Sequence, residues 1–300
     1  MGGRARSHPA HNGTVLGLGV RRQLLAPLFA LALLLSQVAH GQVYKIIYAF
    51  NGKNKLTAGT SLARDTSGNF YGASTYGSVR NCTQGPCGAI YKIDPQGKET
   101  TLYSFKGPPD GANPMAVVAD ASGTIYGTTQ FGGSSTFRYC GGGCGTVFRL
   151  TSSGNETVLH SFTQPPRDGI SPQSAVIRDS KGNLYGTTYF GGPHSEYGNP
   201  GEGTVFKIAN GKESLLYSFT GGDDGGLPNA ALLLRQGVLY GTTVFGGSID
   251  SKQCITVLGD GCGTVFKVEE GKESVLYRFN NKADGGSPAA SLIADKSGNL

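Results

Sequence analysis

Six cysteines, arranged as three close pairs, are the residues of this 300-residue chain best suited to covalent or metal chemistry. The pairs are Cys82 with Cys87, Cys140 with Cys144, and Cys254 with Cys262. Six cysteines allow 15 connectivities, but the close spacing within each pair favours the three local bridges. Each pair alone supplies two ligands, whereas structural zinc requires four, often including histidine. We therefore predict three local disulfides and no metal or other cofactor.

Histidine is scarce, which limits metal and acid–base chemistry. Beyond the N-terminal leader the chain retains only His160 and His194. His160 stands where related segments carry tyrosine, at Tyr103, Tyr217 and Tyr277. We interpret His160 as a packing residue.

Catalytic motifs are missing from the sequence. There is no Gly-x-Ser-x-Gly, His-Glu-x-x-His or phosphate-binding glycine loop. Asp223-Asp224-Gly225-Gly226 faintly suggests a calcium loop, but it lacks the alternating oxygen ligands that calcium loops need. A turn accounts for the same residues. No catalytic residue is predicted, and an enzyme is the less favoured interpretation.

A tandem repeat of about 57 residues organises the chain. A Gly-x-x-x-Lys/Arg-aliphatic motif begins at Gly88, Gly145, Gly203 and Gly263, in steps of 57, 58 and 60 residues. An Asp-Gly-x-x-Pro motif recurs in the same register, as do a Tyr-Gly pair and an aromatic segment ending in Phe. We place units at about 51–105, 106–162, 163–219 and 220–279, with a partial unit at 280–300.

Each unit contains four short segments rich in β-branched and aromatic residues, bounded by Gly, Pro, Asn or Asp. In the third unit they are Ser174–Ile177, Leu184–Thr188, Thr204–Ile208 and Leu215–Phe219. Four antiparallel strands per unit predict an all-β fold, a β-propeller of four-stranded blades. A stacked β-solenoid fits the meander less well. The lone segment Val43–Phe50 resembles a fourth strand, so both a five-bladed ring and an incomplete ring remain open.

Long connections should emerge on one side of such blades, because strand direction alternates. These are the Asp-Gly-x-x-Pro segment and the cysteine loop between the second and third strands. Loops on a rigid scaffold commonly carry function. The predicted ligand or partner surface uses unrepeated residues in these loops, namely Arg80, Phe137, Arg138, Tyr139, His194, Glu196, Tyr197 and the insertion 249–260.

The N-terminal 41 residues predict export. Arg21-Arg22 precede an apolar run from Leu24 to Leu35, too short to span a bilayer comfortably, and small residues precede a cleavage point after Gly41. Four of the 26 basic side chains lie in this leader, leaving 22 against 20 acidic ones. The mature segment 42–300 thus has no basic patch for nucleic acid and no predicted transmembrane span.

These motifs resemble the GloVer tandem repeat of exported bacterial "choice-of-anchor" proteins. The resemblance is carried by Leu-Tyr-Gly-Thr-Thr-x-Phe-Gly-Gly, Gly-Thr-Val-Phe-Lys-Ile, Leu-Tyr-Ser-Phe and Asp-Gly-x-x-Pro, in order, over residues 42–300. It implies an exported, propeller-like repeat protein without an established activity. The first unit diverges, at Tyr71-Gly72-Ala73-Ser74 and Gly88-Ala89-Ile90-Tyr91.

Two functional hypotheses follow. The first is a secreted or cell-surface binding or structural propeller that contacts a glycan or cell-envelope component. The alternative is an extracellular hydrolase or lyase acting on polysaccharide. Because the last unit stops at Leu300, where Tyr-Gly should follow, we expect the sequence to be a fragment or an early-ended reading frame.

Overall fold

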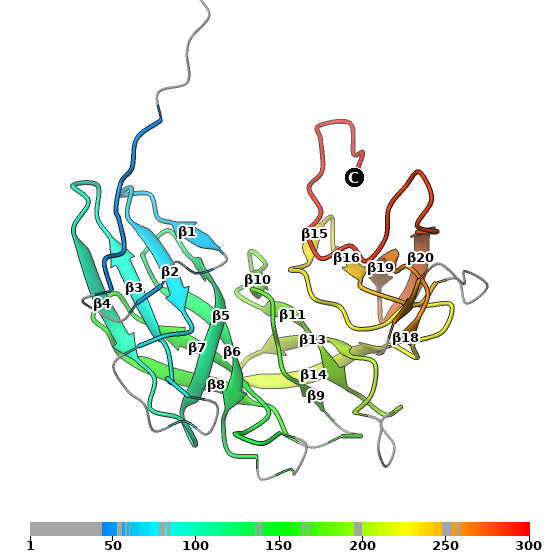
Figure 1. Cartoon of the computed structure of the whole chain (residues 1–300), viewed down its shortest axis with the longest axis horizontal. Coiled ribbons are helices and arrows are strands. Elements are labelled where there is room, and N and C mark those ends of the chain that lie inside the picture. The colour runs from blue at the N-terminus through cyan, green and yellow to red at the C-terminus, as the bar shows by residue number, and fades with distance from the viewer. Residues whose placement is uncertain are drawn as a thin grey trace, which may run out of the picture. The chain divides into compact units, whose positions relative to one another are not determined.

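A computed structural model describes residues 44–300, apart from 53–55, 58, 60, 78–81, 83–84, 136, 138–139, 164, 167, 195–199, 248–253 and 257–258. All of its strands lie in the compact unit Ile47–Leu300 (Figure 1). No helix occurs among the described residues, so the predicted all-β class is confirmed.

Four antiparallel sheets of four strands each follow one another along the chain. The first contains β1 (Leu62–Arg64), β2 (Phe70–Ser74), β3 (Ala89–Ile93) and β4 (Glu99–Ser104). The second contains β5 (Gly111–Ala119), β6 (Ile125–Gly132), β7 (Thr146–Leu150) and β8 (Glu156–Ser161). The third contains β10 (Ile177–Arg178), β11 (Leu184–Thr188), β13 (Thr204–Ala209) and β14 (Lys212–Ser218). The fourth contains β15 (Leu233–Arg235), β16 (Val238–Thr243), β19 (Thr264–Glu269) and β20 (Lys272–Arg278).

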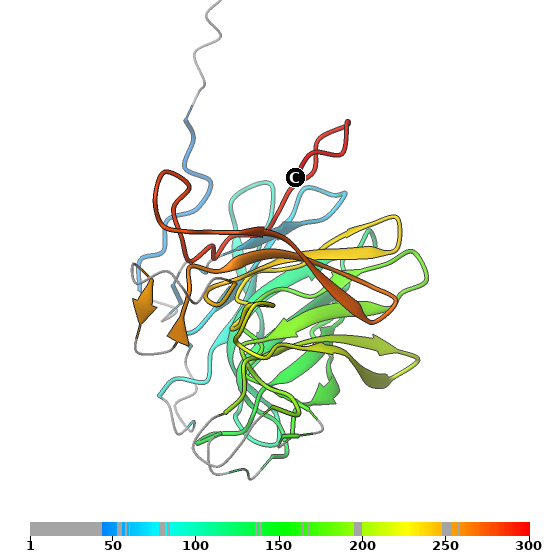
Figure 2. The ribbon, with the colours of Figure 1, turned by 90° about the vertical axis from the view of Figure 1, so that its right-hand side faces the viewer.

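Two small ribbons supplement these blades. β9 (Gly169–Ile170) pairs with β12 (Phe190–Gly191), and β17 (Ile255–Thr256) pairs with β18 (Gly259–Asp260). The order within each blade is the up-and-down meander predicted for a propeller. Figure 1 shows the first strand of each blade on the inner side of the succession, and Figure 2 shows the same blades from the side.

Adjacent blades are joined by a repeated aromatic contact. The Phe that follows the fourth strand of one blade packs edge-to-face on the third-strand aromatic ring of the next. The pairs are Phe105–Phe148, Phe162–Phe206 and Phe219–Phe266, with ring centroids 5.2, 5.2 and 5.0 Å apart. All six rings are buried. This packing buries the face that a lone blade would leave open to water.

The Tyr-Gly motif makes room for the aromatic ring. A Cβ added to Gly186 would lie 2.5 Å from the Cζ of Phe206, and the equivalent glycines face their own third-strand rings at similar distances. Any larger residue at this point of β11 would displace the ring. The glycine is therefore required by the blade contact.

The first strand of the third blade is displaced from its predicted position. Ser174–Ile177 was the expected strand, but only Ile177–Arg178 pairs with β11. The carbonyl of Ser174 instead accepts a hydrogen bond from Thr128 of the preceding blade, at 2.8 Å. Ser174 therefore bonds to the preceding blade, and only the residues that follow it along the chain pair with β11 of their own sheet.

The described part of Val43–Phe50 forms no strand, contrary to the expectation of a fourth-strand ladder. Its side chains nevertheless occupy the corresponding place. Phe50 packs edge-to-face on Tyr91 of β3, with centroids 5.2 Å apart, as Phe105 packs on Phe148. Tyr48 and Phe50 cover the cluster formed around Leu56 and Tyr91.

We predict that Phe219→Ala destabilises the fold by about 3–5 kcal/mol, because it empties a buried site between two blades. Phe279→Ala is the matched control, since Phe279 holds the same repeat position but is only half-buried. Urea unfolding followed by circular dichroism measures both. Equal losses at the two positions would contradict the role assigned to the aromatic contact.

Candidate functional site

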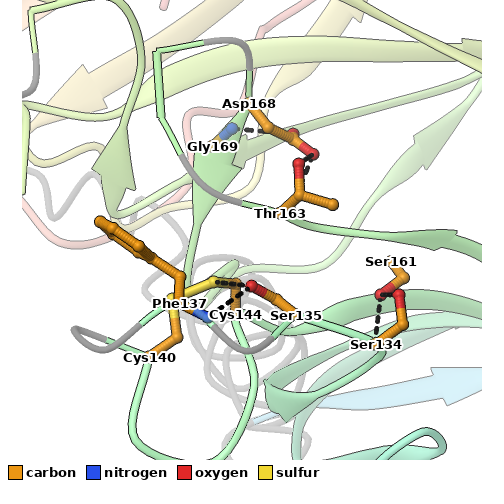
Figure 3. Close-up of a disulfide and its surroundings, with 9 residues drawn as sticks. All are labelled: Ser134, Ser135, Phe137, Cys140, Cys144, Ser161, Thr163, Asp168 and Gly169. Atoms are coloured by element: carbon orange, nitrogen blue, oxygen red, sulfur yellow. Dashed lines mark hydrogen bonds between the residues drawn. A yellow bond between two sulfur atoms is a disulfide. The ribbon is translucent and has the colours of Figure 1, made fainter.

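Three disulfides close the loops between the second and third strands of blades one, two and four. Cys82–Cys87, Cys140–Cys144 and Cys254–Cys262 have Cα–Cα separations of 5.3, 4.9 and 5.1 Å. The predicted pairing is confirmed. Figure 3 shows Cys140–Cys144 with Phe137 and Ser135 beside it. Three such bridges are consistent with an oxidising, extracytoplasmic compartment.

The cysteine loop and the Asp-Gly-x-x-Pro segment meet on one side of the blades, as predicted. The amide of Asn113 donates to the Cys87 carbonyl at 2.9 Å, and that of Ser171 donates to the Cys144 carbonyl at 2.8 Å. Leu227 and Ser287 make the same bond to Glu202 and Cys262. We call this side the disulfide face. Its loops are therefore held by bonds between consecutive blades.

The residue before the motif's proline has a positive φ in all four copies, from 52° at Leu227 to 60° at Ser171. The proline then packs against the glycine that opens the preceding third strand. A Cβ on Gly203 would lie 2.7 Å from the Cδ of Pro228. The aspartate of the motif caps the turn, as Asp168 does for the amide of Thr163 at 2.9 Å. These contacts favour the turn interpretation of the motif.

A cleft of about 250 Å³ opens on the disulfide face between the first and second blades. Its walls come from the Cys82–Cys87 loop, the end of β6 and the Asp-Gly-x-x-Pro segment. Because this last segment connects consecutive blades, we call it the linking segment. The lining residues are Thr75, Tyr76, Cys82, Pro86, Ala112, Asn113, Phe131 and Gly142.

Two side chains give the cleft its polar chemistry. Tyr76 is 54% exposed, and its backbone is fixed by Ser74, whose hydroxyl donates to the Tyr76 carbonyl at 2.7 Å. The side-chain Nδ2 of Asn113 donates to Gln130 Oε1 at 2.7 Å, and this bond orients the Asn113 side chain. Tyr76 holds the repeat position that Phe190 and Phe245 fill in later blades. The first blade thus adds a phenol hydroxyl and exposes it.

Most of the predicted ligand residues cannot be placed. Arg80, Arg138, Tyr139, Glu196 and Tyr197 lie outside the described residues, as does much of the insertion 249–260. Phe137 is partly buried against the core cluster beside Cys140–Cys144, and His194 is exposed in the third-blade loop. Neither lines the cleft. Sequence reasoning missed Tyr76, although a tyrosine in a column of phenylalanines was a usable signal.

His160 occupies the predicted tyrosine slot. Its Nε2 lies 3.1 Å from Asp168 Oδ2, where Tyr103 and Tyr217 donate their hydroxyls to Asp110 and Asp224. Its ring packs edge-to-face on Phe162, at 4.6 Å between centroids. Glu213 of β14 completes a His–Asp–Glu group whose ligand atoms lie within 4.8 Å of one another. These three residues could hold a metal ion.

Each boundary between these blades also carries a half-buried glutamate. Burial, with a smaller contribution from the nearby Asp110, raises the pKa of Glu156 to about 7. Burial and Asp224 likewise raise the pKa of Glu273 to about 7, although Arg278 opposes them. Both glutamates have a buried Oε1 without a hydrogen-bond partner among the described residues.

A second cavity, of about 420 Å³, lies between the inner strands β5 and β10 and is lined in part by Asp120, Arg178 and Asp179. Burial would raise the pKa of Asp179, but hydrogen bonds from Asn183, Tyr185 and Lys181 outweigh it and lower that pKa. Asp120 is held similarly by Ser122 and Thr124. Both carboxylates are turn caps kept ionised, which does not suit a general acid.

In the part of the chain that the structure describes, we find no helix with the length and hydropathy of a membrane span. A family model described as the Gloeobacter/Verrucomicrobia repeat matches residues 34–255. No curated protein matches the chain.

Two solved structures resemble the fold. A gluconolactonase from Xanthomonas campestris has 12% identity and a TM-score of 0.46, with 82% of this chain and 70% of that chain covered. TolB from Acinetobacter baumannii has 14% identity and a TM-score of 0.41, with 73% of this chain and 43% of that chain covered. At these levels neither likeness extends to activity or ligand.

We predict that stability falls as pH rises from about 4.5 to about 7, because Glu156 and Glu273 must ionise in sites that favour their protonated forms. Glu156→Gln should match the wild type near pH 4 and exceed it at pH 8. After allowance for solvent screening, the gain is on the order of 1 kcal/mol, or ~2–4 °C in Tm.

Thermal unfolding at pH 4 and pH 8, at constant ionic strength, measures this difference. Glu270→Gln is the matched control, because Glu270 is exposed in a turn. A Glu156→Gln variant whose advantage did not change with pH would refute the assignment.

Proposed function

We propose, from the premise that this chain belongs to the Gloeobacter/Verrucomicrobia repeat family, that it is an exported propeller-type binding protein whose disulfide face recognises a glycan. The blade scaffold supports a binding or structural role in general terms. The glycan and the face that binds it are the parts of the proposal that require a test.

The cleft between the first and second blades is the observation that supports this proposal. Two of its walls are restrained by a hydrogen bond and a disulfide. The amide of Asn113 is bonded to the Cys87 carbonyl, and Cys87 is linked to Cys82. A site built from restrained loops loses little conformational entropy when a ligand binds. The cleft is therefore preorganised.

The chemistry of the cleft suits a sugar ring. An exposed tyrosine ring offers an apolar face to the C–H groups of a pyranose and a hydroxyl at its edge. The Asn113 amide offers a donor and an acceptor for sugar hydroxyls. A volume of about 250 Å³ is just below the usual range of small-molecule sites, ~300–1,000 Å³. One sugar unit of a longer envelope glycan is the expected occupant.

Polysaccharide hydrolysis or elimination is the weaker alternative. Glycosidases use a pair of carboxyl groups, one of which has a raised pKa. The inner-strand carboxylates Asp120 and Asp179 are instead turn caps with lowered pKa values. The glutamates with raised pKa values lie at blade boundaries and do not line the cleft.

Export is part of the same proposal. The predicted signal segment 1–41 lies outside the described residues, which begin at residue 44. The three disulfides support an extracytoplasmic location. Cleavage near Gly41 would release the repeat domain 42–300.

We predict that Tyr76→Ala weakens glycan binding at least tenfold, because it removes both the stacking surface and the hydroxyl. A glycan array on the purified segment 42–300 identifies the sugar, and isothermal titration calorimetry measures the change. Asn113→Gly should weaken binding as well, while keeping the positive φ of 58°. Tyr44→Ala, at an exposed tyrosine remote in sequence from the cleft, is the control. Absence of any bound sugar would overturn the glycan assignment.

A further inference from the structure

We propose that His160, Asp168 and Glu213 form a binding site for one zinc-type divalent transition-metal ion at the boundary between the second and third blades. His160 lies on β8, Asp168 begins the linking segment, and Glu213 lies on β14 of the next blade. The site is separate from the cleft assigned to ligand binding.

The donor atoms are already close together. His160 Nε2 and Asp168 Oδ2 are 3.1 Å apart, and one oxygen of Glu213 completes a group within 4.8 Å. Tetrahedral zinc with bonds of about 2.0 Å places its ligands roughly 3.3 Å from one another. The His–Asp pair has this spacing, and a rotation of the longer Glu213 side chain would supply the third ligand.

The two carboxyl groups of this cluster favour binding of a cation. Asp168 is only 5% exposed. Among the described residues, His160 is the one basic group in ion-pair contact with Asp168, and no basic group is in ion-pair contact with Glu213. Two carboxyl groups thus share one imidazole at a partly buried boundary, where Asp168 is buried and His160 is 19% exposed. A divalent ion would neutralise both carboxylates, and His160 would coordinate it as a neutral imidazole.

Asp168 is oriented before any ion binds. Its Oδ2 accepts from the amide and the hydroxyl of Thr163, at 2.9 and 3.2 Å, and its Oδ1 accepts from the Gly169 amide at 2.8 Å. Figure 3 shows these bonds. Such outer contacts commonly fix a metal-binding carboxylate in place. The turn therefore holds the Asp168 carboxylate in place before the metal ion binds.

One imidazole nitrogen with two carboxylates selects the class of metal. Magnesium and calcium favour sites made entirely of oxygen, with six or more ligands. Zinc and its neighbours accept mixed nitrogen and oxygen donors in four-coordinate sites. Three protein ligands leave the fourth position for water. The ion would tie β8, the linking segment and β14 together.

The other blade boundaries provide an internal comparison. Tyr103 donates to Asp110 at 2.9 Å, and Glu156 lies close enough to interact with both. The two carboxyl groups are thus repeated, but a phenol takes the place of the imidazole. A single substitution distinguishes a boundary that binds metal from one that does not.

The experiment is a titration of the purified segment 42–300 with Zn²⁺ by calorimetry and with Co²⁺ by visible absorption. The wild type should bind one ion and show the intense d–d bands of four-coordinate Co²⁺. His160→Tyr, which copies the sister boundaries, should fold and bind none. Tyr103→His should create a second site with Asp110 and Glu156, giving two ions per chain.

Two further variants separate the site from other sources of binding. His194→Ala should leave the stoichiometry unchanged, because His194 lies in a different loop. Glu213→Gln should weaken affinity at least tenfold, and Zn²⁺ should raise the Tm of the wild type but not of this variant. The proposal is overturned if the wild type binds no ion, or if His160→Tyr, folded by circular dichroism, binds as the wild type does.

Discussion

The structure depends on one repeated contact, the insertion of a phenylalanine from one blade against an aromatic ring of the next. A four-stranded sheet in water has two faces to cover, and no single unit of about 57 residues can cover both. Phe162 and Phe219 are fully buried where they meet Phe206 and Phe266. The glycine of each Tyr-Gly pair, such as Gly186, is required by this contact. The same contact thus constrains both the sequence of each blade and its packing on the next.

This dependence explains why the polar side chains of the repeated motifs are occupied by structural hydrogen bonds and are not available to a ligand. The second threonine of Gly-Thr-Thr bonds to the threonine that begins the third strand, as Thr188 does with Thr204. The first threonine donates to a carbonyl of the following blade, as Thr128 and Thr187 do. The aspartates cap turns, and the prolines pack on glycines of the previous blade. A residue that recurs in every unit is used at every boundary. Recognition chemistry must then come from positions at which the units differ.

The sequence was sufficient to predict the blade architecture, the disulfide pairs and the side on which the loops gather. These follow from local features: strand propensity, turn residues, cysteine spacing and the alternation of strand direction. Register between blades was not predictable, because it depends on side-chain hydrogen bonds such as Thr128 to the Ser174 carbonyl, which join residues 46 positions apart. The predicted first strand of the third blade was misplaced for that reason.

The candidate sites were harder to predict for a related reason. The cleft is formed by segments from two units, so Tyr76 and Phe131 become neighbours only after the blades pack. Sequence reasoning searched the unrepeated loop residues and overlooked a repeated position with an altered side chain. His160 was noticed as an exception to a tyrosine column, but Glu213 was not visible as its partner, because the two are 53 positions apart.

Small deviations from a repeat have large chemical consequences when the surrounding contacts are kept. At Tyr76 a hydroxyl is added to a ring that the fold already positions, and at His160 an imidazole replaces a phenol without loss of the bond to aspartate. In both cases neighbouring units show that the scaffold does not need the change. The scaffold supplies orientation and partial burial, while the substituted atom determines the chemistry. In a repeat protein of this kind, the exceptions within otherwise constant columns are therefore the first places to look for binding.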